Sequence, residues 1–202
     1  MTRALIEWGA ALPAPAKINH FLHVVGRRAD GYHLLQTLFR FIDRSDQVRL
    51  YPRDDEQVVL RTPLPGVAPE QDLTVRAVRA LQRASGCRYG VDIDLFKRLP
   101  MGGGLGGGSS DAATVLHALD RLWGLNLPRE RLQQIGLELG ADVPVFIFGR
   151  AAFGEGVGER LSPLTLAPAW YLVVVPATPV ATASVFADPT LTRDSPAVTI
   201  AA

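Results

Sequence analysis

The chain has 202 residues, of which 48% are hydrophobic and 20% charged, and its formal net charge is +1. These values exclude extended disorder, and the near-neutral charge argues against a nucleic-acid partner. No apolar run approaches the ~20 residues of a membrane helix, no signal peptide is recognisable, and a single cysteine excludes an internal disulfide, so we expect a cytoplasmic protein with no membrane contact.

The first 61 residues are expected to form mainly β-strands. Runs rich in β-branched and aromatic residues alternate with turn-prone segments such as DRSD at 43–46. The expected strands are Ala4–Trp8, Ile18–Val25, Leu34–Ile42, Val48–Tyr51 and Val58–Arg61.

Helical periodicity begins near Glu70. The apolar residues of Glu70–Ser85 recur at helical spacing, and Gly86 follows as a C-terminal cap. After an alternating strand at Val91–Phe96, a helix is expected from a cap at Ser109 or Ser110 to Leu122. The remaining expected elements are a helix at Pro128–Leu139, a buried strand within residues 140–149 and a strand at Tyr171–Val175.

Six of the 19 glycines lie between positions 102 and 108, in the segment Pro100–Ser110 (PMGGGLGGGSS). Glycines let backbone amides approach a ligand closely, and a helix N-terminus adds unpaired N–H groups, so the segment predicts a phosphate-binding loop. A flexible linker is the structural alternative, but linkers do not usually join a strand to a capped helix. A Walker A loop is excluded because no lysine follows the glycines, and a G-x-G-x-x-G match within so many glycines is weak evidence for a dinucleotide site.

Four motifs occur in order: PAKINHF at 15–21, GRRADGYHLLQT at 26–37, LPMGGGLGGGSSDAA at 99–113 and GADVPVF at 140–146. Together they resemble the GHMP kinase superfamily, and within it the kinases that act on 4-diphosphocytidyl-2-C-methyl-D-erythritol. The resemblance implies an α+β fold of two domains with a mixed or antiparallel sheet. Residues 1–160 would form the N-terminal, ATP-binding domain, and residues 161–202 would begin an incomplete C-terminal α/β domain.

The resemblance also implies an ATP- and Mg²⁺-dependent phosphorylation of the substrate's 2-hydroxyl, a step of non-mevalonate isoprenoid precursor biosynthesis. No protein ligand for the metal is assigned beyond the Ser110 hydroxyl, which is a candidate for Mg²⁺. The residues that would hold the ATP phosphates are Pro100, Met101, Gly102, Gly103, Gly104, Leu105, Gly106, Gly107, Gly108, Ser109 and Ser110.

By the same resemblance, Asp142 matches the catalytic aspartate that accepts the hydroxyl proton, and Lys17 the lysine that keeps this carboxylate ionised. By residue type alone, Lys17 would be a surface lysine and Asp142 a helix cap. The residues expected on the substrate side are Asn19, Tyr32, His33 and Phe186, with Tyr32 and Phe186 enclosing the cytosine ring and His33 reading its polar edge.

Two charged residues beside the loop are expected to be structural: Lys97 as a solvated side chain, and Asp111 as an acid of the first helical turn that complements the helix dipole. The kinases that the motifs resemble continue beyond Ile200 and carry another glycine-rich loop, which this chain lacks. The alternatives left open are a catalytically silent fragment, a GHMP kinase for another small alcohol and an RNA-binding module. We expect a monomer or a weak homodimer that binds a small-molecule substrate.

Overall fold

A computed structural model describes residues 6–176 and 182–199 of the chain. The fold is α+β, as predicted, with one mixed six-stranded sheet. The path β3-β4-β2-β5-β6 is hydrogen-bonded in that order, and β1 pairs with β2. Among the strands of the described residues, only β3 and β4 run parallel to each other. The strands are β1 (Leu12–Arg27), β2 (His33–Arg53), β3 (Val58–Leu60), β4 (Gly90–Phe96), β5 (Ala152–Gly156) and β6 (Arg160–Pro163).

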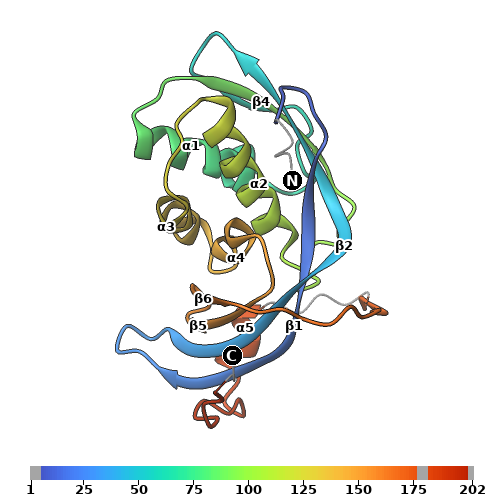
Figure 1. The fold of residues 1–202 in the computed structure, drawn as a ribbon, viewed down its shortest axis with the longest axis vertical. Coiled ribbons are helices and arrows are strands. Elements are labelled where there is room, and N and C mark those ends of the chain that lie inside the picture. The colour runs from blue at the N-terminus through green and yellow to red at the C-terminus, as the bar shows by residue number, and fades with distance from the viewer. Residues whose placement is uncertain (1–5, 177–181, 200–202) are drawn as a thin grey trace.

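Four helices, α1 to α4, gather on one side of the β1–β2–β4 part of the sheet (Figure 1). Their apolar faces meet the sheet in a core whose fully buried side chains include Leu50 and Ile93 from strands and Leu81, Leu116 and Ile147 from helices. The helices are α1 (Leu73–Ser85), α2 (Gly107–Leu122), α3 (Arg129–Leu139), α4 (Val143–Phe148) and α5 (Thr182–Ala187), with a 3₁₀ turn at Pro69–Gln71.

The long hairpin of β1 and β2 extends beyond the helices to the region of β5 and β6 (Figure 1). The sequence predicted each of its arms in shorter pieces, with a turn at DRSD, but β2 continues through that segment. Pro15 pairs with Ser45 and Ala16 with Ile42, so residues 43 and 44 form a bulge opposite one peptide of β1. The bulge absorbs the turn-prone residues without ending the strand.

Two expected strands are absent from the described residues. Residues 143–148 form helix α4, which begins with Pro144 in its first turn and ends at Gly149 in a left-handed conformation. Tyr171–Val175 runs without strand pairing. The strand expected at Ala4–Trp8 lies partly outside the described residues, and its remaining part, from Ile6, is not a strand.

The helix that follows the glycine loop also begins differently from the prediction. Its N-cap is Gly106, with φ of 71° and no side-chain cap, and Ser109 and Ser110 lie inside the helix. By contrast, α1 has the predicted Gly86 C-cap, and Asp72 caps its N-terminus by accepting the Thr74 N–H. No helix within residues 6–176 and 182–199 is long and apolar enough to cross a membrane.

Candidate active site

The glycine-rich loop joins β4 to α2 and lies against β1. The Lys17 N–H donates to the Leu105 carbonyl at 3.0 Å, which ties the loop to this strand. Gly102, Gly104 and Gly106 have φ near +70°, a region that strains other residues. A Cβ on Gly106 would lie 2.9 Å from two ring carbons of Phe146 and 3.2 Å from Lys17 Cε. Glycine at 106 therefore lets the loop pass close to both β1 and α4.

A buried charge network holds both ends of this loop. Asp46, fully buried in β2, accepts the backbone N–H groups of Arg98 and Leu99 at 2.5 and 2.8 Å and pairs with Lys97 Nζ. Lys97 Nζ also donates to Asp111 Oδ2 at 2.7 Å. Because Lys97 precedes the loop and Asp111 follows it, this lysine links the loop's entry to its exit. The expectation of a solvated Lys97 is wrong, because its side chain is largely buried in this network. The expectation that Asp111 lies in the first helical turn is also wrong, because α2 begins at Gly107 and its first turn has no acidic residue.

The network contains two carboxylates and one ammonium in a buried setting. Burial raises the pKa of Asp111 to about 7, although the Lys97 charge opposes the shift. Burial also disfavours the charged form of Lys97, but Asp111 and Asp46 outweigh it, so the pKa of Lys97 lies above its usual range. The lysine therefore stays charged, while Asp111 titrates near neutral pH.

Lys17 and Asp142 meet beside the glycine loop. Lys17 Nζ lies 3.2 Å from Asp142 Oδ2, and the lysine side chain is buried while that of Asp142 is 36% exposed. Asp142 occupies the N-cap position of α4, but its side chain makes no cap hydrogen bond. The carboxylate is thus paired with the lysine rather than used to cap the helix.

A chain of hydrogen bonds from the sheet positions the lysine. Lys17 Nζ donates to Asn19 Oδ1 at 2.7 Å, and Asn19 Nδ2 donates to Thr37 Oγ1 at 2.7 Å. Thr37 is buried and donates to the Phe21 carbonyl at 2.6 Å. Asn19 was expected on the substrate side, and the structure shows its side chain supporting the catalytic candidate Lys17.

A pocket of about 810 Å³ brings together the other residues expected on the substrate side. Tyr32, His33 and Phe186 all line it, although more than 150 positions separate Phe186 from the other two in the chain. Gly140 and Ala141, which immediately precede Asp142, also line it. The rings of His33 and Phe186 stack with centroids 5.1 Å apart, whereas Tyr32 is 67% exposed.

Few side chains near the glycine-rich loop could act as ligands to a metal ion. No cluster of three or more acidic, histidine or cysteine side chains suited to a metal occurs in the described ranges. The Ser110 Oγ is buried without a hydrogen-bond partner and lines a hollow of about 230 Å³ with Pro15 and Phe146. The hollow is otherwise mainly apolar, so this single hydroxyl suits an ion only where phosphate oxygens supply most of the ligands, as they often do for Mg²⁺.

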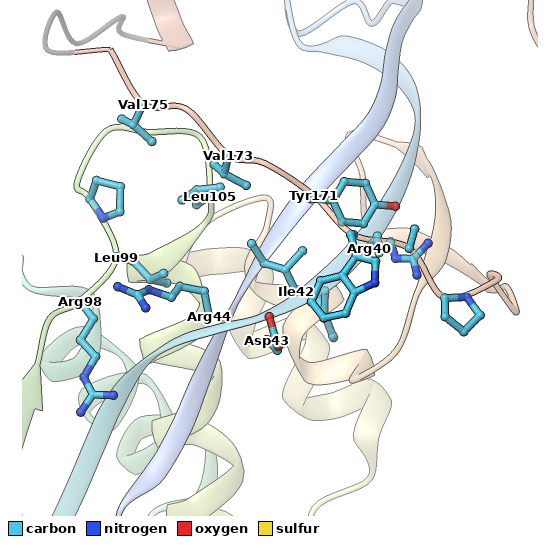
Figure 2. A pocket seen from close by; sticks show the side chains of 15 residues that line it. Arg40, Ile42, Asp43, Arg44, Arg98, Leu99, Leu105, Tyr171, Val173 and Val175 are labelled. Carbon is cyan, nitrogen blue, oxygen red and sulfur yellow. The ribbon is translucent and has the colours of Figure 1, made fainter.

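A second pocket, of about 860 Å³, is lined in part by Pro100 and Leu105 of the loop (Figure 2). Leu99, Leu105 and Ile42 form its apolar floor, and the segment carrying Tyr171 and Val175 crosses it. Arg40 lies over the Tyr171 ring, with its guanidinium carbon 5.2 Å from the centroid, and donates to the Ala167 carbonyl at 2.7 Å. These contacts attach the segment after β6 to the sheet.

Sequence reasoning missed Asp46 and Thr37 and set Lys97 aside. Asp46 and Lys97 are 51 positions apart, and only the pairing of β2 with β4 brings them together. A local signal existed, because Asp46 lies two residues before Val48, the start of an expected strand, but the DRSD segment was attributed to a turn.

The sequence and fold were compared with known proteins. The family model for the GHMP kinases N terminal domain matches residues 72–150. The 4-diphosphocytidyl-2-C-methyl-D-erythritol kinase of Chromobacterium violaceum is 69% identical over 174 residues, which cover 86% of this chain and 61% of that protein. The kinase of the same name from Thiobacillus denitrificans is 63% identical over 191 residues, which cover 95% of this chain and 69% of that protein. The chain thus spans about 61 to 69% of the length of these curated relatives.

Solved structures show the same fold. A crystal structure of 4-(cytidine 5'-diphospho)-2C-methyl-D-erythritol kinase superposes with a TM-score of 0.68 at 43% identity, covering 78% of this chain and 56% of that one. Homoserine kinase from Cytophaga hutchinsonii superposes with a TM-score of 0.60 at 17% identity, covering 83% and 55%. The second likeness concerns the fold alone.

Proposed function

Because the chain belongs to the 4-diphosphocytidyl-2-C-methyl-D-erythritol kinase family of GHMP kinases, we propose that it transfers the γ-phosphate of ATP to the 2-hydroxyl of 4-diphosphocytidyl-2-C-methyl-D-erythritol. The observation that carries this proposal is the Lys17–Asp142 pair. It lies between the glycine-rich loop, which contacts Lys17, and the pocket of Tyr32, His33 and Phe186, whose wall leads to Asp142. A phosphate donor and an alcohol acceptor bound at these two places would meet at the pair.

The pair has the chemistry that phosphoryl transfer requires. The transition state needs positioning and compensation of negative charge rather than a covalent intermediate. Asp142, which is partly exposed and free of a capping bond, accepts the proton of the attacking hydroxyl. Lys17, 3.2 Å from this carboxylate, offsets charge on the transferring phosphoryl group.

The glycine-rich loop supplies the ATP site. Kinases of this family use ATP, and the loop offers backbone N–H groups at the start of α2, where no side chain caps the helix. Mg²⁺ would bridge the phosphates and reduce their charge, with Ser110 as its candidate protein ligand. The loop residues 100–110 are proposed to bind phosphate mainly through the backbone, so their side chains contribute little to ATP affinity.

The aromatic pocket supplies the cytidine site. Stacking between rings such as Tyr32 and Phe186 is tolerant of base identity, so base choice requires hydrogen bonds at the ring edge, which we assign to His33. This assignment distinguishes the substrate from mevalonate or homoserine, which have no aromatic base to stack.

The test measures ADP release with Mg²⁺-ATP and 4-diphosphocytidyl-2-C-methyl-D-erythritol. Two proteins are assayed: the 202-residue chain, and the same chain extended by the C-terminal part of the C. violaceum relative. We expect turnover in at least one of them, and Asp142→Asn lowers its kcat by about 10²- to 10⁴-fold. The affinity for ATP changes only a few-fold because Asp142 acts on the other substrate.

Asp54→Asn is the matched control, since Asp54 is an exposed carboxylate in the turn after β2. It should leave turnover unchanged. Absence of Asp142-dependent turnover from both proteins, or equal turnover with homoserine or mevalonate, would contradict the proposed function.

A further inference from the structure

Arg193 makes four hydrogen bonds beside the proposed cytidine site. Its guanidinium donates to the carbonyl of Phe186 at 2.9 Å, of Asp188 at 2.7 Å and of Leu191 at 2.9 Å. Its Nε donates to Nε2 of His33 at 3.2 Å. One side chain therefore contacts both residues whose rings stack in the pocket.

The three carbonyls define how the chain turns after helix α5. They belong to the end of this short helix and to the bend that follows, so one planar guanidinium holds the whole turn. This turn fixes the backbone of Phe186. The Phe186 ring can then lie on the His33 ring at an interplanar angle of 24°.

The fourth bond determines the protonation of His33. A guanidinium can only donate hydrogen bonds, so the Nε2 atom that receives its N–H must carry a lone pair. The proton of the neutral ring is therefore on Nδ1. Burial and the nearby charges of Arg193 and Arg27 lower the pKa of His33, so the ring stays neutral at physiological pH.

We propose that Arg193 is a positioning residue for the cytidine end of the substrate, because it fixes His33 as the Nδ1–H tautomer and holds Phe186 against it. This inference rests on the proposed function, in which these two residues bind the base. A His33 ring that carries its proton on Nδ1 can donate a hydrogen bond from this atom to an acceptor at the edge of the pyrimidine ring. A charged ring, or a mixture of tautomers, would discriminate less well between donor and acceptor edges.

Lysine cannot replace arginine in this role. An ammonium is a single point with three donors, whereas the acceptors around Arg193 are spread over the ring of His33 and three carbonyls. Arg193→Lys therefore keeps the charge but loses the geometry, and Arg193→Ala loses both. Arg83→Ala is the control, because Arg83 is exposed in the last turn of α1, far in sequence from the pocket residues.

The experiment combines kinetics with ¹⁵N NMR of the histidine rings, using the form of the protein that shows Asp142-dependent turnover. In the wild type we expect the Nδ1–H tautomer of His33 and a pKa below 6.5. In Arg193→Ala the tautomer becomes mixed and the pKa rises, and the KM for the cytidine substrate rises about tenfold or more. The KM for ATP stays within a few-fold, and Arg193→Lys resembles Arg193→Ala in KM and tautomer.

Failure of this inference is distinguishable from failure of the proposed function. If the wild type turns over the substrate but Arg193→Ala has the same KM and the same His33 spectrum, Arg193 has no positioning role. If neither the 202-residue chain nor the extended chain turns over the substrate, the proposed function fails, and NMR spectra of the 202-residue chain still report whether Arg193 sets the tautomer of His33. An Arg193 variant whose KM for the cytidine substrate rises while His33 keeps the Nδ1–H tautomer also contradicts the inference, because a purely structural role would give that result.

Discussion

Lys17 is held from two directions, so its long and flexible side chain has a defined position. Asn19 receives one of its N–H groups, and Asp142 lies 3.2 Å away on the other side. The bond from Asn19 to the buried Thr37 fixes the amide orientation, so its oxygen faces the lysine. The sequence motifs predicted functional roles for Lys17, Asn19 and Asp142, and the fold adds that the Asn19 side chain accepts a hydrogen bond from Lys17.

Asp111 provides a residue-scale prediction about pH. Its pKa is about 7 in the fold and near 4 in an unfolded chain, mainly because burial disfavours its charge. Between these two values the native state binds more protons than the unfolded state, so Asp111 makes the free energy of unfolding decrease as the pH rises. Its share of the slope is at most about 1.4 kcal/mol per pH unit.

Asp111→Asn should remove this contribution. Denaturant unfolding at a series of pH values from 4 to 8 should show a flatter pH dependence for the variant than for the wild type. Lys97 keeps its other partner, Asp46, in the variant. Asp54→Asn, at the exposed site, should reproduce the wild-type slope, and identical slopes for Asp111→Asn and the wild type would overturn the explanation.

At the scale of elements, the glycine loop is held at both ends and along one side. Asp46 and Lys97 fix its entry, Asp111 fixes its exit, and the Lys17–Leu105 backbone bond attaches its middle to β1. For the proposed phosphate site, this means that the backbone N–H groups at the start of α2 are already positioned without a ligand. Such preorganisation reduces the entropy lost on binding.

Gly104 and Gly106 allow the packing of this loop to be tested separately from its backbone strain. Both have φ of 71°, so Ala at either position costs a similar ~1 kcal/mol or more of backbone strain. A Cβ at Gly104 meets nothing within 4 Å, whereas one at Gly106 meets Phe146 and Lys17. We expect Gly106→Ala to lower both the melting temperature and kcat clearly more than Gly104→Ala, as measured by calorimetry and ADP release. Equal effects would show that the contact with Phe146 and Lys17 is unimportant.

The elements that the sequence predicted well are those with a clear period or a recognisable cap. The helix ending at Gly86 and the alternating strand near residues 91–96 were both found within a few residues of their predicted bounds. Helix α4 was predicted as a strand because its six apolar residues are too few to show a period, and burial makes either structure suitable. The cap of α2 was assigned to serines because a glycine N-cap carries no side-chain signal.

The site was predictable to the extent that it depends on motifs and not on tertiary contacts. Lys17 and Asp142 were predicted as a catalytic pair from their motifs, and the fold places their side chains 3.2 Å apart. The network of Asp46, Lys97 and Asp111 and the contacts of Arg193 join segments that are distant in sequence, so no local pattern reveals them. Their chemistry becomes visible only when strand pairing is known.

At the scale of the whole molecule, the described residues form a main core, a small second cluster of Ala16, Leu99 and Leu105, and a loosely attached segment after β6. The buried apolar side chains lie between Ala14 and Phe153, whereas Trp170 is 99% and Leu172 92% exposed. A few polar bonds attach the later segment to the hairpin, including Ser195 to Val24 and Val198 to Gln36. We propose a domain boundary near residue 160 on this basis, so that Phe186 reaches the pocket from a different unit than His33.

Hydrogen exchange measured by mass spectrometry tests this boundary. Within the described ranges, the backbone amides of residues 165–176 donate no recorded backbone hydrogen bond, so they should exchange close to the rate of an unstructured chain. Amides in the middle of α2 and β4 should be protected by several orders of magnitude, because they open only with the core. Residues 193–199 should be intermediate, since bonds such as Ser195 to Val24 open without disturbing that core. If residues 165–176 were as protected as α2, this segment would belong to the same cooperative unit as the core, and the boundary near residue 160 would be wrong.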